Sequence, residues 1–155
     1  MNKPPTNLVG YCGLYCGACG IYQGRIKQAV QNLREVIRAY GFDKIAPELA
    51  KWEPAFQHYA EFDKVLDGFV KLLGECPGCV AGGGDPGCRV RECCRPKAFQ
   101  TCAECDKMGT CEILQRVAPE KKELSKIKGT GIDKWIEEMQ RKVSAGYCYL
   151  DERLK

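Results

Sequence analysis

The stretch YCGLYCGACG, from Tyr11 to Gly20, places three cysteines and three glycines within ten residues. Its cysteines are Cys12, Cys16 and Cys19, in the pattern C-x3-C-x2-C. Because glycine adopts backbone conformations that are closed to other residues, such a segment can turn tightly around an ion. The stretch therefore predicts that metal ligands organise this part of the chain.

The cysteine content of the whole chain points the same way. Twelve cysteines in 155 residues are several times ordinary usage. The first ten residues contain no apolar run of the kind found in signal peptides, and no stretch approaches the ~20 apolar residues that cross a membrane. We therefore expect a cytoplasmic protein without a membrane partner, in which reduced thiols are metal ligands more often than disulfides.

Eight of the twelve cysteines lie between Glu75 and Glu112. Two C-x2-C pairs, CPGC at 76–79 and CAEC at 102–105, frame this region. Two intervening residues form a tight turn that directs both thiolates toward one ion, and backbone N–H groups in the turn can hydrogen-bond the sulfurs. Two such pairs around a third cysteine cluster are a strong metal-binding signal.

The spacing leaves the pairing of these cysteines open. A tetrahedral site needs four thiolates. Local sequence can supply them from the CPGC pair with Cys88 and Cys93, which leaves the CAEC pair and Cys111 one ligand short. The missing ligand could be Cys94, or one of Cys12, Cys16 and Cys19. An interleaved arrangement, in which the CPGC and CAEC pairs share one ion, is equally allowed. Cys94 and Cys148 are set aside from the ligand set, and His58, the single histidine, lies far from the cysteines in sequence.

Hydrophobic periodicity predicts a mainly α fold with an irregular, cysteine-rich, metal-stapled lobe. We expect one domain over 1–155, made of 11–74 with two long helices, the lobe 75–112, and C-terminal helices in 113–155. The two long helices should form the core by packing against each other. Pro119 to Lys128 should be a charged, solvated helix. The helices are expected at Arg25–Tyr40, Phe42–Trp52, Pro54–Leu73, Cys111–Val117, Pro119–Lys128 and Ile132–Val143.

Four motifs in this order, CGLYCGAC, CPGC, CRVREC and CAEC, resemble a cysteine-rich domain-of-unknown-function family of bacteria and archaea. The resemblance implies metal binding, with zinc as the usual metal, on a small helical scaffold. Cys94 is an extra neighbour relative to the family pattern. The positions that match the family pattern are Cys12, Cys16, Cys19, Cys76, Cys79, Cys88, Cys93, Cys102, Cys105 and Cys111.

Zinc is the preferred cofactor, and an iron–sulfur cluster for electron transfer or redox sensing is the alternative, because thiolate tetrahedra accept iron as well as zinc. An enzyme is the less favoured interpretation, since no Cys/His pair or pair of carboxylates suggests catalysis. The net charge of +4 is too small to indicate a dedicated nucleic-acid binder. A basic cluster could contact nucleic acid, but the simpler interpretation is that it offsets the negative charge of the thiolates. Binding to a protein partner is also possible. This cluster consists of Arg89, Arg91, Arg95 and Lys97.

Overall fold

The computed structural model describes residues 6–117 and 121–154. Its regular structure is helical, and the only pairing between extended segments in this part of the chain is a single bridge from Val9 to Tyr15. The mainly α prediction is therefore confirmed. No helix of the described residues is both long enough and apolar enough to cross a membrane.

The chain divides into two compact units. One unit contains residues 24–75, and the other combines 1–23 with 76–155. The N-terminal cysteine stretch thus shares a unit with the later cysteines, whereas the sequence grouped it with the two long helices. We call 24–75 the hairpin unit and the remainder the cysteine unit.

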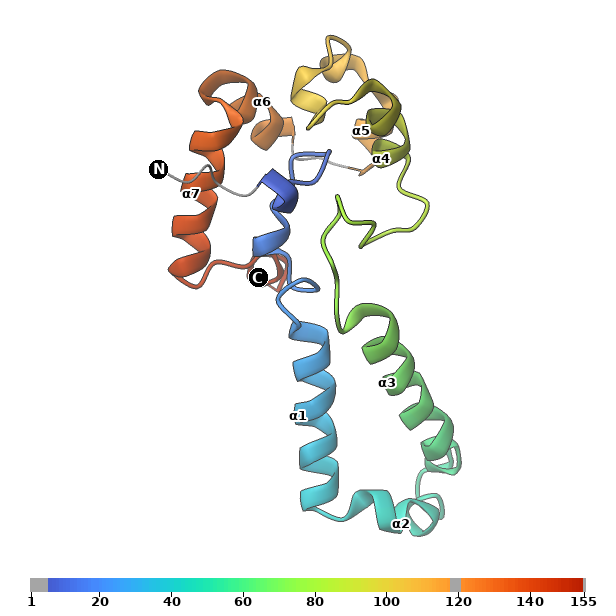
Figure 1. The fold of residues 1–155 in the computed structure, drawn as a ribbon. Helices are drawn as coiled ribbons and strands as arrows, with labels where there is room; N and C mark the ends of the chain where they lie inside the picture. The colour runs from blue at the N-terminus through green and yellow to red at the C-terminus, as the bar shows by residue number, and fades with distance from the viewer. Residues whose placement is uncertain (1–5, 118–120, 155) are drawn as a thin grey trace. The chain divides into compact units, whose positions relative to one another are not determined.

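In the hairpin unit, α1 (Arg25–Ala39) and α3 (Tyr59–Leu73) run antiparallel, with α2 (Phe42–Leu49) and the 3-10 turn η3 (Pro54–His58) between them (Figure 1). These bounds agree closely with the predicted helices. Gly41, with a φ of 71°, provides the left-handed turn between α1 and α2, a conformation that glycine adopts at little cost. Glu53 caps η3 by accepting a hydrogen bond from the N–H of Ala55.

The expected core between the two long helices is wrong. Although α1 and α3 pack against each other, the hairpin unit buries only Val30, Ala46 and Leu66 among its apolar side chains. The reason is geometric, because two antiparallel helices can cover only a narrow strip of each other's surface. The principal core lies in the cysteine unit.

The cysteine unit consists of short helices joined by turns. The α-helices are α4 (Arg89–Cys94), α5 (Glu112–Val117), α6 (Lys121–Thr130), α7 (Ile132–Ser144) and α8 (Tyr149–Arg153). The 3-10 turns are η1 (Thr6–Leu8), η2 (Cys16–Ala18), η4 (Arg95–Lys97), η5 (Cys102–Glu104) and η6 (Met108–Thr110). Helices α4 and α8 were not predicted, since each is too short to show periodicity. Pro119, the expected start of α6, lies outside the described residues.

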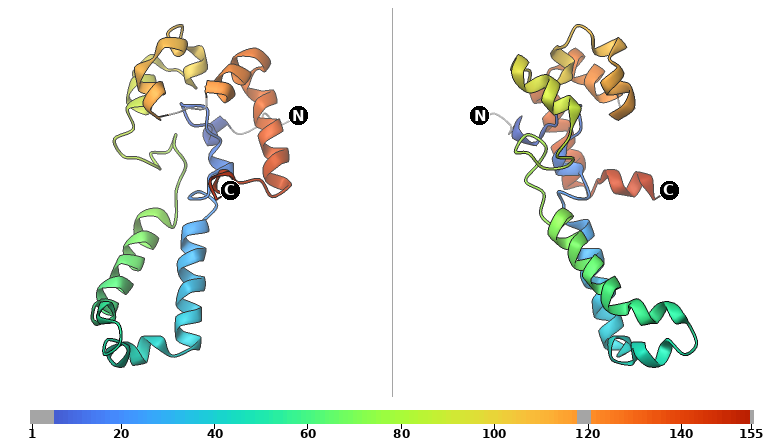
Figure 2. Two further views of the ribbon diagram at one scale, coloured as in Figure 1. Left: turned by 180° about the vertical axis from the view of Figure 1, so that it is seen from behind. Right: turned by 90° about the vertical axis from the view of Figure 1, so that its right-hand side faces the viewer.

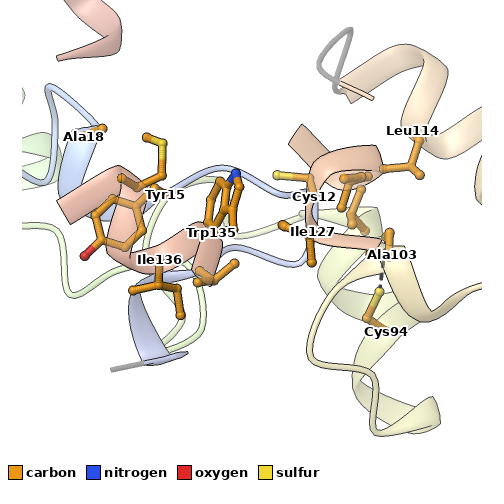
Figure 3. Close-up of a cluster of buried hydrophobic side chains, with 14 residues drawn as sticks. Cys12, Tyr15, Ala18, Cys94, Ala103, Leu114, Ile127, Trp135 and Ile136 are labelled. Carbon is orange, nitrogen blue, oxygen red and sulfur yellow. Dashed lines mark hydrogen bonds between the residues drawn. The ribbon is translucent and has the colours of Figure 1, made fainter. Parts of the chain in front are cut away.

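The core of the cysteine unit is built around Trp135 of α7, which is 1% exposed (Figure 3). Its ring packs edge-to-face on Tyr15 at a centroid distance of 6.0 Å, and its Nε1–H donates a 2.7 Å hydrogen bond to Glu123. Leu124 and Ile127 of α6 belong to the same buried cluster. The expectation of a solvated α6 is therefore wrong. Lys122, Lys126 and Lys128 are exposed, but Glu123 bonds Trp135 and two aliphatic residues spaced by three enter the core.

Backbone hydrogen bonds tie the N-terminal stretch into this unit. The N–H of Gly10 donates to Leu14 at 2.7 Å, closing a turn, and the N–H of Cys102 donates to Tyr11 at 2.8 Å. Helix α7 packs against η1 and η2 (Figure 2). The segment that carries the first three cysteines is thereby held against the segment that carries the CAEC pair.

Candidate metal centre

All twelve cysteines lie in the cysteine unit. The structure describes every one of them, and each is a free thiol. Burial is uneven: five of them are buried and the others are half-buried. The buried thiols are Cys12, Cys16, Cys94, Cys102 and Cys148.

Cys16 and Cys79 form the first close thiol pair. The backbone N–H of Cys79 donates a 3.2 Å hydrogen bond to the Cys16 sulfur, although the residues are 63 positions apart. The Cys79 thiol also hydrogen-bonds the Cys16 sulfur, which lowers the pKa of Cys16 and raises that of Cys79. Cys19 and Cys76 are near enough to raise the pKa of Cys16 slightly. The C-x3-C-x2-C stretch and the CPGC pair thus meet at one point.

The glycines that follow the CPGC pair allow the chain to pack closely against its cysteines. The N–H of Gly83 donates to Gly78 at 2.9 Å, and a β-carbon on Gly83 would lie 2.6 Å from the Cys76 sulfur. No other residue fits at position 83 without displacing that thiol. The glycine run is therefore folded against the cysteines, where the sequence indicated only a connector.

Arg91 of α4 holds the same loop from the inside. It is 6% exposed, and its guanidinium donates to the carbonyls of Gly83 at 2.9 Å and Asp85 at 2.6 Å. Two further bonds reach the carbonyls of Cys79 and Pro86, both at 3.2 Å. Its positive charge also opposes the rise in the pKa of Cys79. Arg91 therefore fixes the backbone that carries the CPGC pair.

Cys94 and Cys102 form the second close pair, with their sulfurs 3.4 Å apart in the buried core. Figure 3 labels Cys94 and marks its hydrogen bond with a dashed line. Burial raises the pKa of both thiols, and the hydrogen bond between them raises that of Cys102 further. Cys93 and Cys105 contribute smaller electrostatic effects to the pKa of Cys94. Cys94 therefore belongs to this group, although the sequence analysis had set it aside.

A capping box holds the turn of the CAEC pair. The Thr101 hydroxyl accepts from the N–H of Ala103 at 3.2 Å, and the Glu104 carboxylate accepts from the N–H of Thr101 at 3.0 Å and of Gln100 at 2.7 Å. Such reciprocal bonding satisfies N–H groups that a helix start leaves free. The spacing of Thr101 and Glu104 carries this signal in the sequence, where it was overlooked.

Cys12 lies close to thiols of both groups. Burial raises the pKa of Cys12 to about 11, with smaller contributions from Cys79 and Cys88. Cys12 and Cys111 in turn contribute to the raised pKa of Cys102. All ten predicted ligands therefore lie in one unit, and those named here influence one another electrostatically.

The thiols form close pairs, but they do not form larger groups with the geometry of a metal site. Among the residues that the structure describes, no group of three or more Cys, His, Asp or Glu side chains is arranged to hold a metal ion. The buried Cys148 lies beside the end of the N-terminal cysteine stretch, with its sulfur 3.6 Å from where a β-carbon on Gly20 would be. The exposed His58 belongs to the hairpin unit. The donor chemistry is thus all thiol, presented as pairs with further thiols nearby.

The predicted basic cluster is largely engaged within the chain. Besides Arg91, Arg95 donates to the Val80 carbonyl at 3.2 Å, and the Lys97 ammonium lies 3.1 Å from the Cys93 sulfur. The contact with Cys93 raises the pKa of Lys97. This arrangement fits the interpretation that these cations offset thiol charge.

These features define a small helical protein in which thiols from separate motifs gather in one unit. The chain belongs to the family described as protein of unknown function DUF3795, which matches residues 8–116. That range includes both thiol pairs and the whole hairpin unit, so the resemblance drawn from the motifs is confirmed at the level of the family. No curated protein and no solved structure matches the chain.

Proposed function

We propose that this protein binds zinc through cysteine thiolates and that the metal has a structural role. The observation that carries the proposal is the pairing of thiols from different motifs. Cys16 meets Cys79 across 63 positions, and Cys94 meets Cys102 in the core. Free thiols brought together from separate turns of the chain are typical ligands of a structural metal.

The proposal assigns each pair to a different ion. Cys16 and Cys79 would share the first ion with Cys19 and Cys76, whose charges act on Cys16. This grouping joins the N-terminal stretch to the CPGC pair. It differs both from a site made from 76–93 alone and from one in which the two C-x2-C pairs share an ion. The hydrogen bond from the N–H of Cys79 supports it, because backbone N–H groups stabilise metal-bound thiolates.

Cys94 and Cys102 would share the second ion with Cys105, which completes the CAEC pair. The fourth ligand would come from Cys93 or Cys111, both of which act on thiols of this group. Once bound, zinc would cross-link these segments and neutralise their thiolates. A site saturated with thiolates leaves no open position for a substrate, which is the reason to favour a structural role over catalysis.

Iron is the competing metal, since the first group includes the C-x3-C-x2-C stretch, and thiolates hold iron–sulfur clusters as well. Anaerobic purification of the full chain followed by elemental analysis tests the proposal. Zinc at two ions per chain in a colourless protein is the expected result. A brown protein with iron and acid-labile sulfide would overturn the choice of zinc, and a chain free of both metals would overturn metal binding.

A further inference from the structure

The hairpin unit exposes most of its large apolar side chains. Tyr40, Trp52 and Leu72 are each more than 70% exposed, and Val36 and Val65 are more than half exposed. Residues 24–75 are all described, and only three apolar side chains among them are buried. A pair of helices with so small an interior gains little stability from its own packing.

On each of the two long helices, the exposed apolar residues form one stripe. The α1 stripe contains Leu33, Val36 and Tyr40, and the α3 stripe contains Phe62, Val65, Phe69 and Leu72. Spacings of three and four keep each stripe on one side of its helix.

Both stripes lie on the same face of the hairpin. The seam between the helices is marked by the less exposed Val30 and Ile37 on α1 and Leu66 and Val70 on α3. Each residue of an α-helix is rotated by about 100° about the helix axis from the one before it. On both helices the stripe is therefore rotated from the seam residues by roughly 100° in the same sense, that of decreasing residue number. Viewed from one end of the hairpin, the residue order runs clockwise around one helix and anticlockwise around its antiparallel neighbour. Equal rotations away from the seam therefore place both stripes on the same face of the hairpin.

The opposite side of the seam is polar. Arg34 bridges the helices there, donating to the carboxylates of Asp63 at 2.9 Å and Asp67 at 2.8 Å. Lys27 and Glu75 pair at 2.9 Å between the two ends of the unit. The hairpin is therefore a two-helix layer with one apolar face and one charged face.

We propose that two copies of this chain pair through this apolar face to form a four-helix bundle. From the exposed fractions and side-chain areas of order 200 Å², the seven stripe residues expose about 800 Å². That area is about what each partner buries in a standard stable interface, and it exceeds the largest apolar patch of a typical monomer, roughly 300–600 Å².

Charge also favours a second copy as the occupant. The hairpin unit contains eight Lys and Arg residues and eight Asp and Glu residues, so two copies would meet without net repulsion. A two-fold axis brings the same patch of both copies together and requires only self-complementarity. Two apolar-faced helix pairs stacked in this way have the arrangement of a four-helix bundle.

Light scattering after size-exclusion chromatography tests the proposal on the full, reduced chain with its metal as purified. The wild type should have twice the chain mass of 17.3 kDa across the micromolar range. The double variant V36K/V65K places a lysine in each stripe. It should raise the dissociation constant at least about 100-fold while circular dichroism keeps its helical signal, because each charge would be buried without a partner.

The matched control is Q31K/A60K, which adds the same two charges on the polar face, at exposed positions five residues earlier on each helix. It should remain dimeric. A monomeric wild type would overturn the proposal, as would a V36K/V65K variant that stays dimeric. Equal dissociation of both variants would place the interface elsewhere. A monomer whose stripe residues resist hydrogen exchange or labelling would show that its own chain covers the face.

Discussion

The sulfur of Cys94 lies 3.4 Å from the sulfur of Cys102, and both residues are buried in the core of the cysteine unit. This contact links α4 to η5 in the same interior that holds Trp135. A thiol pair in that position is a structural element whether or not metal is bound, because two buried sulfurs satisfy each other's weak hydrogen bonding.

Replacing Cys94 tests whether it is a ligand. Cys94→Ala should remove one of two metal ions per chain, since it takes one thiolate from the second group. Metal content by elemental analysis measures the result. Cys148→Ala is the matched control, because Cys148 is also buried but is not among the thiols that act on Cys94 or Cys102. If Cys94→Ala retains all its metal, Cys94 is a packing residue, and loss of one ion from Cys111→Ala would then assign Cys111 to the second ion.

Removing the metal should unfold the cysteine unit selectively. The two tryptophans report on different units: Trp135 is 1% exposed in the cysteine unit and Trp52 is 77% exposed in the hairpin unit. In a Trp52→Phe variant, a chelator under reducing conditions should shift Trp135 emission to the red as the core opens. Re-adding zinc should reverse the shift. Unchanged emission after complete metal loss would show that the metal does not hold this core.

Arg91→Ala should lower the free energy of unfolding by about 2–4 kcal/mol, because it leaves four loop carbonyls without their donor. Arg91→Lys should recover only part of this loss, since an ammonium cannot reach the same spread of acceptors. Denaturant titration gives the magnitude. Arg89→Ala changes an exposed arginine of the same helix and should have an effect within about 0.5 kcal/mol. Equal effects for both alanine variants would contradict the role assigned to Arg91.

Gly13→Ala should be destabilising for two separable reasons. Gly13 has a φ of 86°, and a β-carbon there would lie 2.9 Å from two side-chain carbons of the buried Leu124. Gly24→Ala meets the same backbone strain at a φ of 72° but has open space around it. We expect losses of about 2–4 kcal/mol for Gly13→Ala and about 1–2 kcal/mol for Gly24→Ala. Thermal unfolding followed by Trp135 fluorescence measures the loss for Gly13→Ala. If the two variants lose similar stability, the Leu124 side chain moves aside for the added methyl group.

Helix positions could be predicted wherever a segment repeats its apolar residues over several turns. For α1, α3 and α7, spacings of three and four gave bounds close to those observed. The location of the core could not be predicted in the same way. Periodicity identifies an apolar face but not what covers it, so the faces of α1 and α3 were assigned to each other when most of their apolar residues are exposed.

The candidate site, too, could be predicted from the sequence only in part. The motifs of the sequence identified the cysteines that gather in one unit, because C-x2-C turns are local. They could not identify the partner of each thiol, since contacts such as Cys16 with Cys79 depend on the whole fold. Cys94 was set aside because its neighbour Cys93 fitted the family pattern. In α4 the two adjacent residues face different ways, which leaves Cys93 half-buried and Cys94 buried.

The ion pair between Lys27 and Glu75 has a consequence for the order of folding. The contact of Cys16 with Cys79 closes a long loop of chain, and loop closure costs entropy that grows with the length of flexible chain. Most of this loop is the hairpin unit, whose two ends Lys27 and Glu75 hold together. Once the hairpin has formed, the effective loop shortens from 63 positions to about 15, eleven from Cys16 to Lys27 and four from Glu75 to Cys79. Formation of the hairpin therefore lowers the entropic cost of bringing these two thiols together.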